Sequence, residues 1–582
     1  MNLHIFDDSL NQKYNENKIL IWNGEKINRV LENNKKIIRT KYLNIIHNII
    51  KNYSLNYKYF RIRDLSLFKM SLINEKNPFK SSAIFECLKL LALEIIIKKN
   101  KINKIIYHGK IDNLHKSLKD FCINQNIDYE REKITLTNSN FKLIFFLTGI
   151  FFFLKQLYKN YNLEKKSKKN FDASIISYFV HFNRHKKKKF QSNLWGDLIK
   201  YLNTKKISIN WFHFYIPSGQ VKKSYLANSM IKNFNLNKYE NHNFVNSVLN
   251  LRDLLNCFLI YCILFVRNVF FLNNNLNFFL SKYSKTNFYY FLKKDLMSSF
   301  FGSTLIYNIM HIVTFDNLLK NIPKQKFGIY IIENQSWEYS FIKLWKKYNH
   351  GKLFAYFNSS VRFWDLRYLK KKNELKNSNE NPDVFLINSN IFKSEIKKLG
   401  YPMSKVFAVE ALRYKNLKPI KKIKKNKKIL IVGDILFKES DILLKFVGKT
   451  IDSLKNYKFY FKPHPTMTLK SINLIKQKYK YIKVLNLNTN EFKKFEFVIC
   501  SNGTSANLDC LIQKLNFCSV NINNTLNLYP IGKYQKLFQA KGHIDLINRI
   551  KYPKKIKFNK IFNQEKNCSK FLSKINEVEI SK

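Results

Sequence analysis

Short apolar segments alternate with amphipathic helical segments along this chain from about residue 76 onward. Two parallel strands must be joined by a crossover of a dozen or more residues, which is usually a helix. The alternation therefore predicts an α/β fold with parallel sheets. Strands are expected at 101–109, 172–182, 207–217, 326–335, 352–360, 382–389, 428–434, 458–465, 481–487 and 496–502. Helices are expected at 82–99, 115–126, 195–206, 337–348, 441–455 and 504–515.

The length of 582 residues exceeds what one ordinary hydrophobic core supports, so two or more domains are expected. A lysine-rich stretch at 415–428 contains a proline and interrupts the alternation, which is typical of a linker. We expect a first Rossmann-like domain at 76–414, on the acceptor side, and a second one at 429–582, which binds the nucleotide. Residues 1–75 are polar and irregularly patterned, and they are expected to form an N-terminal extension.

The net charge of +63 suggests a nucleic-acid-binding protein at first sight. Only 12 of the 103 basic residues are arginines, however, and sequence-specific readers of nucleic acid depend on arginine for bidentate contacts. A specific nucleic-acid partner is therefore not expected. The excess of lysine favours general attraction to anionic surfaces, which include membranes.

Two features bear on where the protein acts. The first residues include Asp7 and Asp8 in place of a basic and then apolar signal peptide, and the eight cysteines form no C-x-x-C pair. We therefore expect a cytoplasmic protein. The apolar stretches 141–154 and 254–266 fall short of the roughly 20 residues that a membrane span needs. Each predicts either a core helix or a helix in peripheral contact with an anionic inner membrane.

The motif FKPHP at 461–465 ends an apolar strand. Its two prolines, in a chain with only 10, fix the backbone and cannot continue a sheet. Lys462 and His464 then lie at the carboxyl end of the strand, where open α/β sheets bind ligands. A lysine and a histidine at that place can neutralise a departing phosphate. An ordinary strand-ending turn is the alternative.

A second motif follows about 40 residues later, where the strand segment 496–500 leads into a turn of small residues and then a helix. Hydroxyl groups and the N–H groups of a helix start together form an anion site. The residues that we expect to bind the donor phosphates here are Ser501, Asn502, Thr504 and Ser505.

The pairing of K-P-H-P with this later turn resembles the carboxyl-terminal half of GT-B glycosyltransferases that build bacterial surface polysaccharides. Similar His-Pro motifs occur in sialyltransferases and Kdo transferases of that architecture, and in polyol-phosphate transferases. The segments 333–338, 361–368 and 409–414 resemble a family of surface carbohydrate biosynthesis proteins. The resemblance implies two Rossmann-like domains facing a crevice, with His464, Thr504 and Ser505 on a cytidine phosphate. The acidic pair followed by glycine that supplies the base in those sialyltransferases has no clear copy in this chain.

Two carboxylates are candidates for the missing base. Glu333 follows a predicted strand, and Glu338 begins the next predicted helix. A carboxylate at the end of a strand can take a proton from an acceptor hydroxyl. Glu338 alternatively stabilises the positive end of its helix.

Several further residues are candidates for binding the sugar or the nucleotide. The segment 361–368 combines two of the rare arginines with a tryptophan, which suits a sugar that bears a carboxylate. For the segment 361–368 the alternative is a structural ion pair between arginine and aspartate. For Glu410 and Arg413 the alternative is a salt bridge between the two domains. Acceptor or sugar contacts are expected from Arg362, Trp364, Asp365 and Arg367, and further donor contacts from Glu410, Arg413 and Asp434.

These residues predict transfer of a nucleotide-activated sugar, favouring a CMP-activated nonulosonic acid or Kdo, to a lipid-linked or oligosaccharide acceptor. No metal and no cofactor are expected, because lysine, histidine and N–H groups can supply the electrostatic stabilisation. The alternatives are a polyol-phosphate transferase that uses a CDP-activated donor, or a non-catalytic membrane-associated assembly factor.

Overall fold

The computed structural model describes residues 1–8, 19–56, 60–131, 141–164, 171–180, 189–217, 221, 223–272, 286–421, 423–521, 526–532, 535–553, 562–565 and 568–580. This part of the chain divides into two compact units, which we treat separately. The first comprises residues 1–158, 249–316 and 334–343, and the second comprises 159–248, 317–333 and 344–582. The boundaries expected at residues 75, 414 and 428 do not coincide with these units.

The first unit contains a parallel sheet in the order β2-β1-β5-β6. Its strands are β1 (Asn2–Phe6), β2 (Ile19–Ile21), β5 (Lys104–Tyr107) and β6 (Asp128–Arg131). The N-terminal segment is thus no irregular extension, because β1 pairs with β5 a hundred residues later in the chain, with Ile5 opposite Tyr107. The strand expected at 101–109 is β5, whereas β1, β2 and β6 are too short for their apolar alternation to stand out in the sequence.

Helices make up most of the rest of the first unit. They are α1 (Glu25–Asn33), α2 (Lys35–Asn56), α3 (Leu72–Glu75), α4 (Ala83–Asn100), α5 (Asp112–Gln125), α6 (Phe141–Tyr161), α9 (Leu251–Leu272), α11 (Tyr289–Phe301) and α12 (Ser303–Lys320), beside a small hairpin of β3 (Arg61–Ile62) and β4 (Leu65–Ser66). The helices α4 and α5 confirm two of those expected from the sequence.

Helix α9 is longer than expected. Apolar residues beyond Arg267 extend it, and residues Leu251–Phe271 are long and apolar enough to cross a membrane, with a mean hydropathy of 2.0. Only 28% of that window is buried, whereas a core helix of a soluble protein is mostly buried. The bent pair α11 and α12, at 43°, passes the same test of length and composition. The expectation that the helix around 254–266 is too short to span a membrane was therefore wrong.

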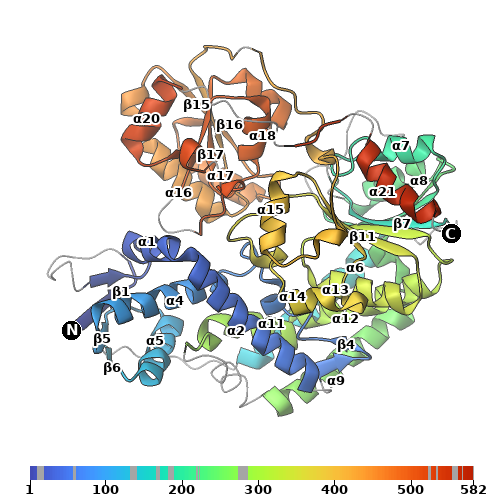
Figure 1. The fold of residues 1–582 in the computed structure, drawn as a ribbon, viewed down its shortest axis with the longest axis horizontal. Helices are drawn as coiled ribbons and strands as arrows, with labels where there is room; N and C mark the ends of the chain where they lie inside the picture. Colours follow the sequence, from blue (N-terminus) through green and yellow to red (C-terminus); the bar gives the residue numbers. More distant parts are fainter. Residues whose placement is uncertain are drawn as a thin grey trace. The chain divides into compact units, whose positions relative to one another are not determined.

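The second unit contains two parallel sheets, which confirms the α/β class with two Rossmann-like sheets (Figure 1). The first has the order β13-β12-β11-β10-β7-β8-β9. Its strands are β7 (Ala173–Tyr178), β8 (Ile209–Phe214), β9 (Glu240–Phe244), β10 (Phe327–Ile331), β11 (Lys352–Phe357), β12 (Val384–Ile387) and β13 (Val406–Ala408). Nearly all their side chains are buried, as helices on both faces of a parallel sheet require. The associated helices are α7 (Leu198–Thr204), α8 (Ser224–Phe234), α13 (Ser336–Lys347), α14 (Lys372–Lys376) and α15 (Ile391–Lys398).

The second sheet has the order β16-β15-β14-β17-β18-β19. Its strands are β14 (Lys428–Val432), β15 (Lys458–Lys462), β16 (Ile482–Val484), β17 (Phe497–Ser501), β18 (Phe517–Val520) and β19 (Gln539–Ala540). Its helices are α16 (Phe437–Gly448), α17 (Leu469–Lys478), α18 (Ala506–Gln513), α19 (Gln535–Phe538) and α20 (His543–Lys551). In both sheets the second and third strands in chain order lie on one side of the first strand, and the fourth lies on its other side. Each sheet therefore has a switch point between its first and fourth strands.

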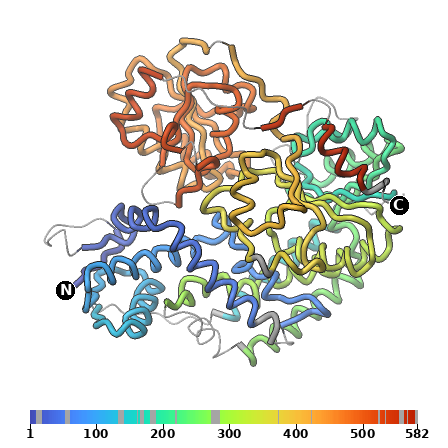
Figure 2. The backbone as a smooth tube through the Cα atoms, in the orientation of Figure 1, coloured from blue at the N-terminus to red at the C-terminus, as the bar shows by residue number. Residues whose placement is uncertain are grey.

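The C-terminal helix α21 (Ser569–Ile580) returns to the first of these sheets, where its red ribbon lies among green helices (Figures 1 and 2). Phe571, Leu572 and Ile575 belong to the core beneath β7 and β8. The C-terminal residues are therefore not confined to the sheet of residues 429–540. Glu410 holds the start of α21, because its two carboxylate oxygens accept backbone N–H bonds of 2.9 Å from Lys570 and Phe571.

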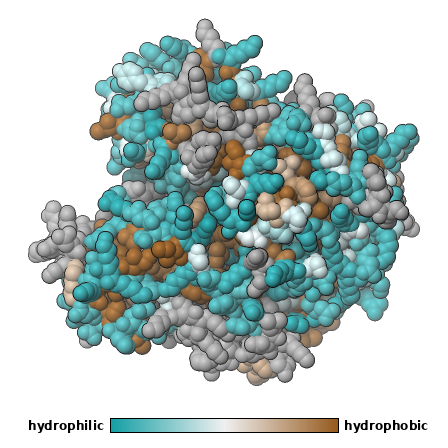
Figure 3. Space-filling model, in the orientation of Figure 1, coloured by the Kyte–Doolittle hydropathy of each residue, from teal (hydrophilic) through white to brown (hydrophobic). Residues whose placement is uncertain are grey.

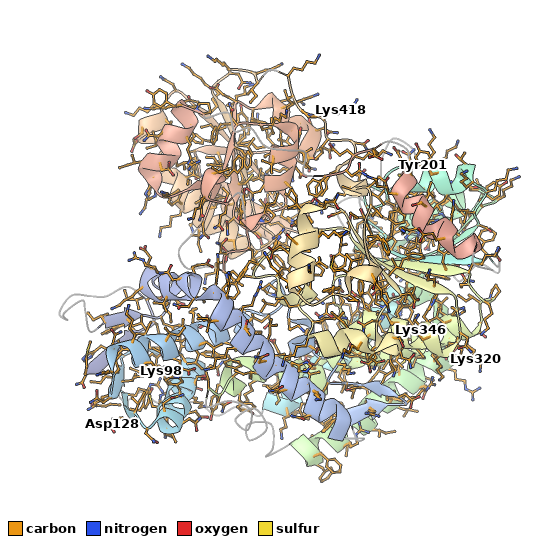
Figure 4. The ribbon with its side chains drawn as sticks, viewed as in Figure 1. Lys98, Asp128, Tyr201, Lys320, Lys346 and Lys418 are labelled. Carbon is orange, nitrogen blue, oxygen red and sulfur yellow. The ribbon has the colours of Figure 1, made fainter. Side chains whose placement is uncertain are left out.

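The beginning of the predicted linker packs against the first sheet's helices. Lys415 is largely buried; its Nζ lies 2.7 Å from the Asp197 carboxylate and 5.4 Å from the ring centroid of Tyr201, which Figure 4 labels. Further on, the N–H of Ile420 donates to the carbonyl of Gln513 in α18. The connection between the sheets is thus anchored on both.

Replacing Glu410 by glutamine should destabilise the protein by about 2 kcal/mol, because a neutral amide offers one acceptor where the carboxylate offers two at a helix start. Urea denaturation followed by circular dichroism measures this change. Glu395→Gln is the control, since Glu395 forms only an exposed pair with Lys398, and it should change stability by no more than about 0.5 kcal/mol. Equal effects of the two substitutions would contradict the capping role.

Candidate functional site

The switch point of the second sheet brings two polar segments together. Strands β14 and β17 are paired in parallel, with Val432 opposite Cys500, so their carboxyl ends are adjacent. Asp434 lies two residues beyond β14, and Ser501 ends β17. The Ser501 hydroxyl donates a 2.7 Å hydrogen bond to Oδ2 of Asp434, which ties the two strand ends to each other. Asp434 and Ser501, both predicted from the sequence, therefore share one site.

Gly503 allows the turn after β17 to pass close to Asp434. A Cβ atom at position 503 would lie 2.8 Å from Oδ2 of Asp434, which is closer than side-chain contacts allow. This contact explains a glycine here in a chain that has only 14. The turn then enters α18, where Oγ1 of Thr504 accepts a 3.3 Å hydrogen bond from the N–H of Ala506.

Two arginines from the segments that follow β11 and β13 reach this turn. Arg362 donates from Nη1 to the carbonyl oxygen of Gly503, and Arg413 donates from Nη2 to Oγ of Ser505 over 3.2 Å. Arg362 is buried, and burial lowers its pKa although Asp365 and Asp434 act to raise it. These contacts link the first parallel sheet to the turn of the second within the same unit.

Lys462 and Asp509 add a second pair of charges beside the turn. Asp509 lies on α18, and burial raises its pKa to about 6, although Arg413 and Lys462 act to lower it. For Lys462, a cation, burial acts in the opposite direction and lowers the pKa, although Asp509 and Cys500 act to raise it. Lys462, at the end of β15, therefore faces the same cluster of charges as Arg413.

His464 forms its described hydrogen bond within its own turn. Its Nδ1 lies 2.8 Å from Oγ1 of Thr466 and 3.3 Å from the Thr466 amide nitrogen. The imidazole is partly exposed, so it is not buried in the apolar core. Its convergence with Thr504 and Ser505 remains a prediction.

Glu333 follows β10 at the switch point of the first sheet, between β10 and β7. Its side chain is 29% exposed, and its Oε1 lies 3.8 Å from Nη1 of Arg367. Arg367 in turn forms a bidentate pair with Asp365, over 2.8 and 2.7 Å. Burial by itself would lower the pKa of Arg367, but Asp365 beside it raises that pKa well above its usual value. Asp365 and Arg367 thus form the structural pair, and they orient Glu333.

Four predicted site residues have structural roles instead. Trp364 is fully buried, so it offers no face to a sugar. Glu338 is buried, and its Oε1 accepts a 2.9 Å hydrogen bond from the N–H of Gln335 at the start of α13. Glu410 caps α21, as described above. Asn502 is buried and donates to Oδ1 of Asn527 over 2.9 Å.

The cluster carries cations and hydroxyl groups of the kind that bind anions. Ser505 accepts the bond from Arg413, and Thr504 accepts from Ala506, so each hydroxyl retains a proton that it can donate to a phosphate oxygen. Lysine and arginine supply positive charge, whereas the N–H groups of Ala506, Asn507 and Leu508 at the start of α18 already donate to oxygens of Thr504 and Ser505. Among the described residues, no group of three or more His, Cys, Asp and Glu side chains could hold a metal ion.

Sequence reasoning missed Gly503 and Asp509. A glycine in a glycine-poor chain marks a close approach, and this signal was available. Asp509 is the single charged residue in the helical segment ANLDCLIQ. An acid in so apolar a segment indicates either an ion pair or a functional carboxylate.

Comparisons with known proteins give likenesses of fold only. No family model matches the chain, and no curated protein matches its sequence. A putative UDP-N-acetylglucosamine 2-epimerase from Listeria monocytogenes aligns over 71% of this chain and 97% of its own, with a TM-score of 0.40 and 10% identity. The Neisseria meningitidis UDP-GlcNAc 2-epimerase bound to UDP-GlcNAc aligns over 70% of this chain and 100% of its own, with a TM-score of 0.37 and 8% identity. The protein TarM aligns over 71% of this chain and 96% of its own, with a TM-score of 0.37 and 11% identity. At TM-scores below 0.5 these likenesses carry no further conclusion about this chain.

The raised pKa of Asp509 predicts a pH dependence of stability. Between the usual value of 3.8 and about 6, the folded state holds a proton that the unfolded state has released. Stability therefore falls as the pH rises through this window, by about 2 to 3 kcal/mol, and the loss is complete above about pH 6. Asp509→Asn should remove this contribution, which urea denaturation between pH 4 and pH 7 measures.

Asp452→Asn is the matched control, because Asp452 is an exposed acid of the same sheet's domain. The native protein should lose stability relative to Asp509→Asn as the pH rises, and it should keep a constant difference from the control. A pH-independent difference between the native protein and Asp509→Asn would contradict the burial of an acid at this site.

Proposed function

We propose that the protein is a GT-B-type glycosyltransferase of bacterial surface polysaccharide synthesis, and that it binds a nucleotide-activated sugar at the switch point of the second sheet. The observation that carries the proposal is the convergence of Arg362 and Arg413 on the turn 503–505. Open parallel sheets bind ligands at the carboxyl ends of their strands, at such a switch point. Lys462, at the end of the next strand, adds a third cation.

In this proposal the phosphates of the donor lie against the turn. Arg362 holds the turn by its carbonyl, while Arg413 and Lys462 offset the charge that develops on the departing nucleotide. The Thr504 and Ser505 hydroxyls donate to phosphate oxygens. Asp434 fixes the turn through Ser501. His464 approaches the phosphate when the ligand is bound, as its resemblance to the His-Pro motif implies.

Glu333 is the proposed general base. It is the one of the two candidate carboxylates that is partly exposed, since Glu338 is buried and bonded at a helix start. Arg367 holds Glu333 in place at 3.8 Å. A carboxylate at the end of a strand can accept the proton of an acceptor hydroxyl as the sugar is transferred.

The favoured donor is a CMP-activated nonulosonic acid or Kdo, and the acceptor is a lipid-linked or soluble oligosaccharide. A CDP-activated polyol phosphate would use the same phosphate contacts. Turnover distinguishes both from a non-catalytic assembly factor that retains only the fold. We place the activity in the cytoplasm.

Lys462→Met should weaken nucleotide-sugar binding about tenfold or more, because it removes a charge-assisted contact to a phosphate. Calorimetry with a panel of CMP-, CDP-, UDP- and GDP-activated donors measures the affinity, and nucleotide release measures turnover. Lys458→Met is the control, since Lys458 is exposed at the opposite end of the same strand. The donor affinity of this control variant should stay within about twofold of that of the native protein.

Glu333→Gln separates binding from chemistry. It should keep the affinity for the donor and lose most of the transfer rate, by about a hundredfold or more for a general base. Release from UDP-sugars alone would overturn the CMP assignment. Failure to bind any member of the donor panel would overturn the proposed function, and binding without turnover on any acceptor would favour the assembly factor.

A further inference from the structure

Helices α6 and α9 of the first unit each expose a row of large apolar side chains. The exposed residues recur every three or four positions, so each row follows one side of its helix. We name the two rows together the α6–α9 face. Its residues are Leu143, Leu147, Phe151, Leu154 and Tyr158 on α6, and Leu255, Leu259, Ile263, Val266 and Phe270 on α9.

The two helices lie side by side and run in opposite directions. Phe146 packs on Phe265 with ring centroids 4.1 Å apart, and Phe153 packs on Phe258 at 5.4 Å. The later residue of α6 thus contacts the earlier residue of α9. The Tyr261 hydroxyl fits over Gly149, where a Cβ atom would collide with it. The two rows therefore belong to one packed helix pair.

Both helices rest with their other sides on α11 and α12. The Tyr261 hydroxyl and the Asn268 amide each donate a 2.7 Å hydrogen bond to a backbone carbonyl of α11, those of Phe301 and Phe300. Phe152 of α6 packs edge-on against Tyr307 of α12. The exposed rows consequently point away from the helices that support them.

These contacts decide how α9 meets a membrane, although its length would allow it to cross one. Helix α11 packs on α4 and α5, with Leu292, Leu296 and Phe300 buried in the core of the unit, so a crossing α9 would have to leave it. The Tyr261 and Asn268 bonds would then be broken in a medium that offers no replacement. A helix with one side held by the protein and the other side apolar instead lies in the plane of the interface.

The charged residues of α6 and α9 indicate which kind of partner binds the α6–α9 face. The helices α6 and α9 carry five basic residues and one acidic residue. Lys155 and Arg252 are exposed, and the opposite directions of the helices place them at the same end of the pair, beside the exposed Tyr158. Lys142 lies near the other end, where burial and the neighbouring Lys293 lower its pKa.

A second copy of the chain would bring like charges together at the ends of such a face, whereas an anionic lipid surface neutralises them. Basic residues and an exposed tyrosine beside an apolar face suit the headgroup layer of a bilayer. The surface in the view of Figure 3 is mainly hydrophilic, with separate apolar patches, as expected for a protein that is not embedded on all sides.

We propose that the α6–α9 face docks on the surface of a bilayer that contains anionic phospholipid, with its apolar rows in the acyl boundary and the neighbouring Lys155 and Arg252 among the headgroups. This proposal goes beyond the proposed function and does not depend on it, because the face and the nucleotide site belong to different units of the chain.

Co-sedimentation of the full-length protein with vesicles tests the docking. Vesicles of phosphatidylcholine with 30% phosphatidylglycerol should bind the native protein, and the double variant Leu259→Asp with Ile263→Asp should bind at least tenfold more weakly. These two side chains are 61% and 65% exposed, so folding tolerates the change. Ile544→Asp is the control: it is an exposed isoleucine on α20, 77% accessible, and its substitution should leave binding unchanged.

A second measurement reports the depth of insertion. In a Leu259→Trp variant, the fluorescence of the new indole should shift to the blue and be quenched by brominated lipid when anionic vesicles are added. Equal vesicle binding by the double variant and the native protein would overturn the proposal, since charge alone would then explain the attraction. A dimer in lipid-free buffer that the double variant abolishes would also overturn it, in favour of a second copy on this face.

Nucleotide-sugar binding by the double variant separates the two proposals. The docking proposal predicts that the variant retains donor affinity while it loses vesicle binding. Loss of both, with lowered thermal stability, would show that the substitutions damage the fold. In that case the milder pair Leu259→Gln with Ile263→Gln decides the question by the same vesicle assay.

Discussion

The arrangement of the candidate site depends on the parallel pairing of β14 with β17. This pairing puts Asp434 and the turn 501–505 at one sheet edge, where the Ser501 hydroxyl bonds the Asp434 carboxylate. The close passage at Gly503 and the start of α18 follow from it. Only a turn fixed in this way presents a carbonyl to Arg362 and a hydroxyl to Arg413.

Burial gives this site its electrostatic character. Arg362 and Asp509 are buried and Arg413 and Lys462 are partly buried, so their interactions are less screened than those of surface lysines. Most of the chain's positive charge is carried by exposed lysines, which attract anions without selecting among them. In the proposed function, selectivity comes from a few arginines and one lysine near the strand ends, and general attraction to anionic surfaces comes from the exposed lysines.

Much of the fold could be predicted because buried parallel strands produce apolar runs, and the strands from β10 to β17 were anticipated at their places except for the three-residue β13. The sequence predicts Asp434, Lys462 and the hydroxyl turn from their strand-end positions, and the structure has Asp434 and that turn at the adjacent ends of β14 and β17. The contacts of Arg362 and Arg413 with that turn could not be predicted, because they join segments about 90 to 140 residues apart. Trp364, Glu338 and Glu410 were misassigned for a related reason: a sequence does not show which polar or aromatic groups are buried by tertiary packing. The same limit hid the N-terminal sheet, whose pairing of β1 with β5 is equally distant.

The central claim is that the turn after β17 and the end of β15 bind the phosphates of a nucleotide-activated sugar. Hydrogen exchange followed by mass spectrometry, with and without a saturating donor or its nucleotide, tests this most directly. Backbone amides in residues 501–508 and around Lys462 should exchange more slowly when the donor is bound, because ordered phosphate contacts suppress local opening. Protection confined to other segments, at donor concentrations where calorimetry shows saturation, would contradict it.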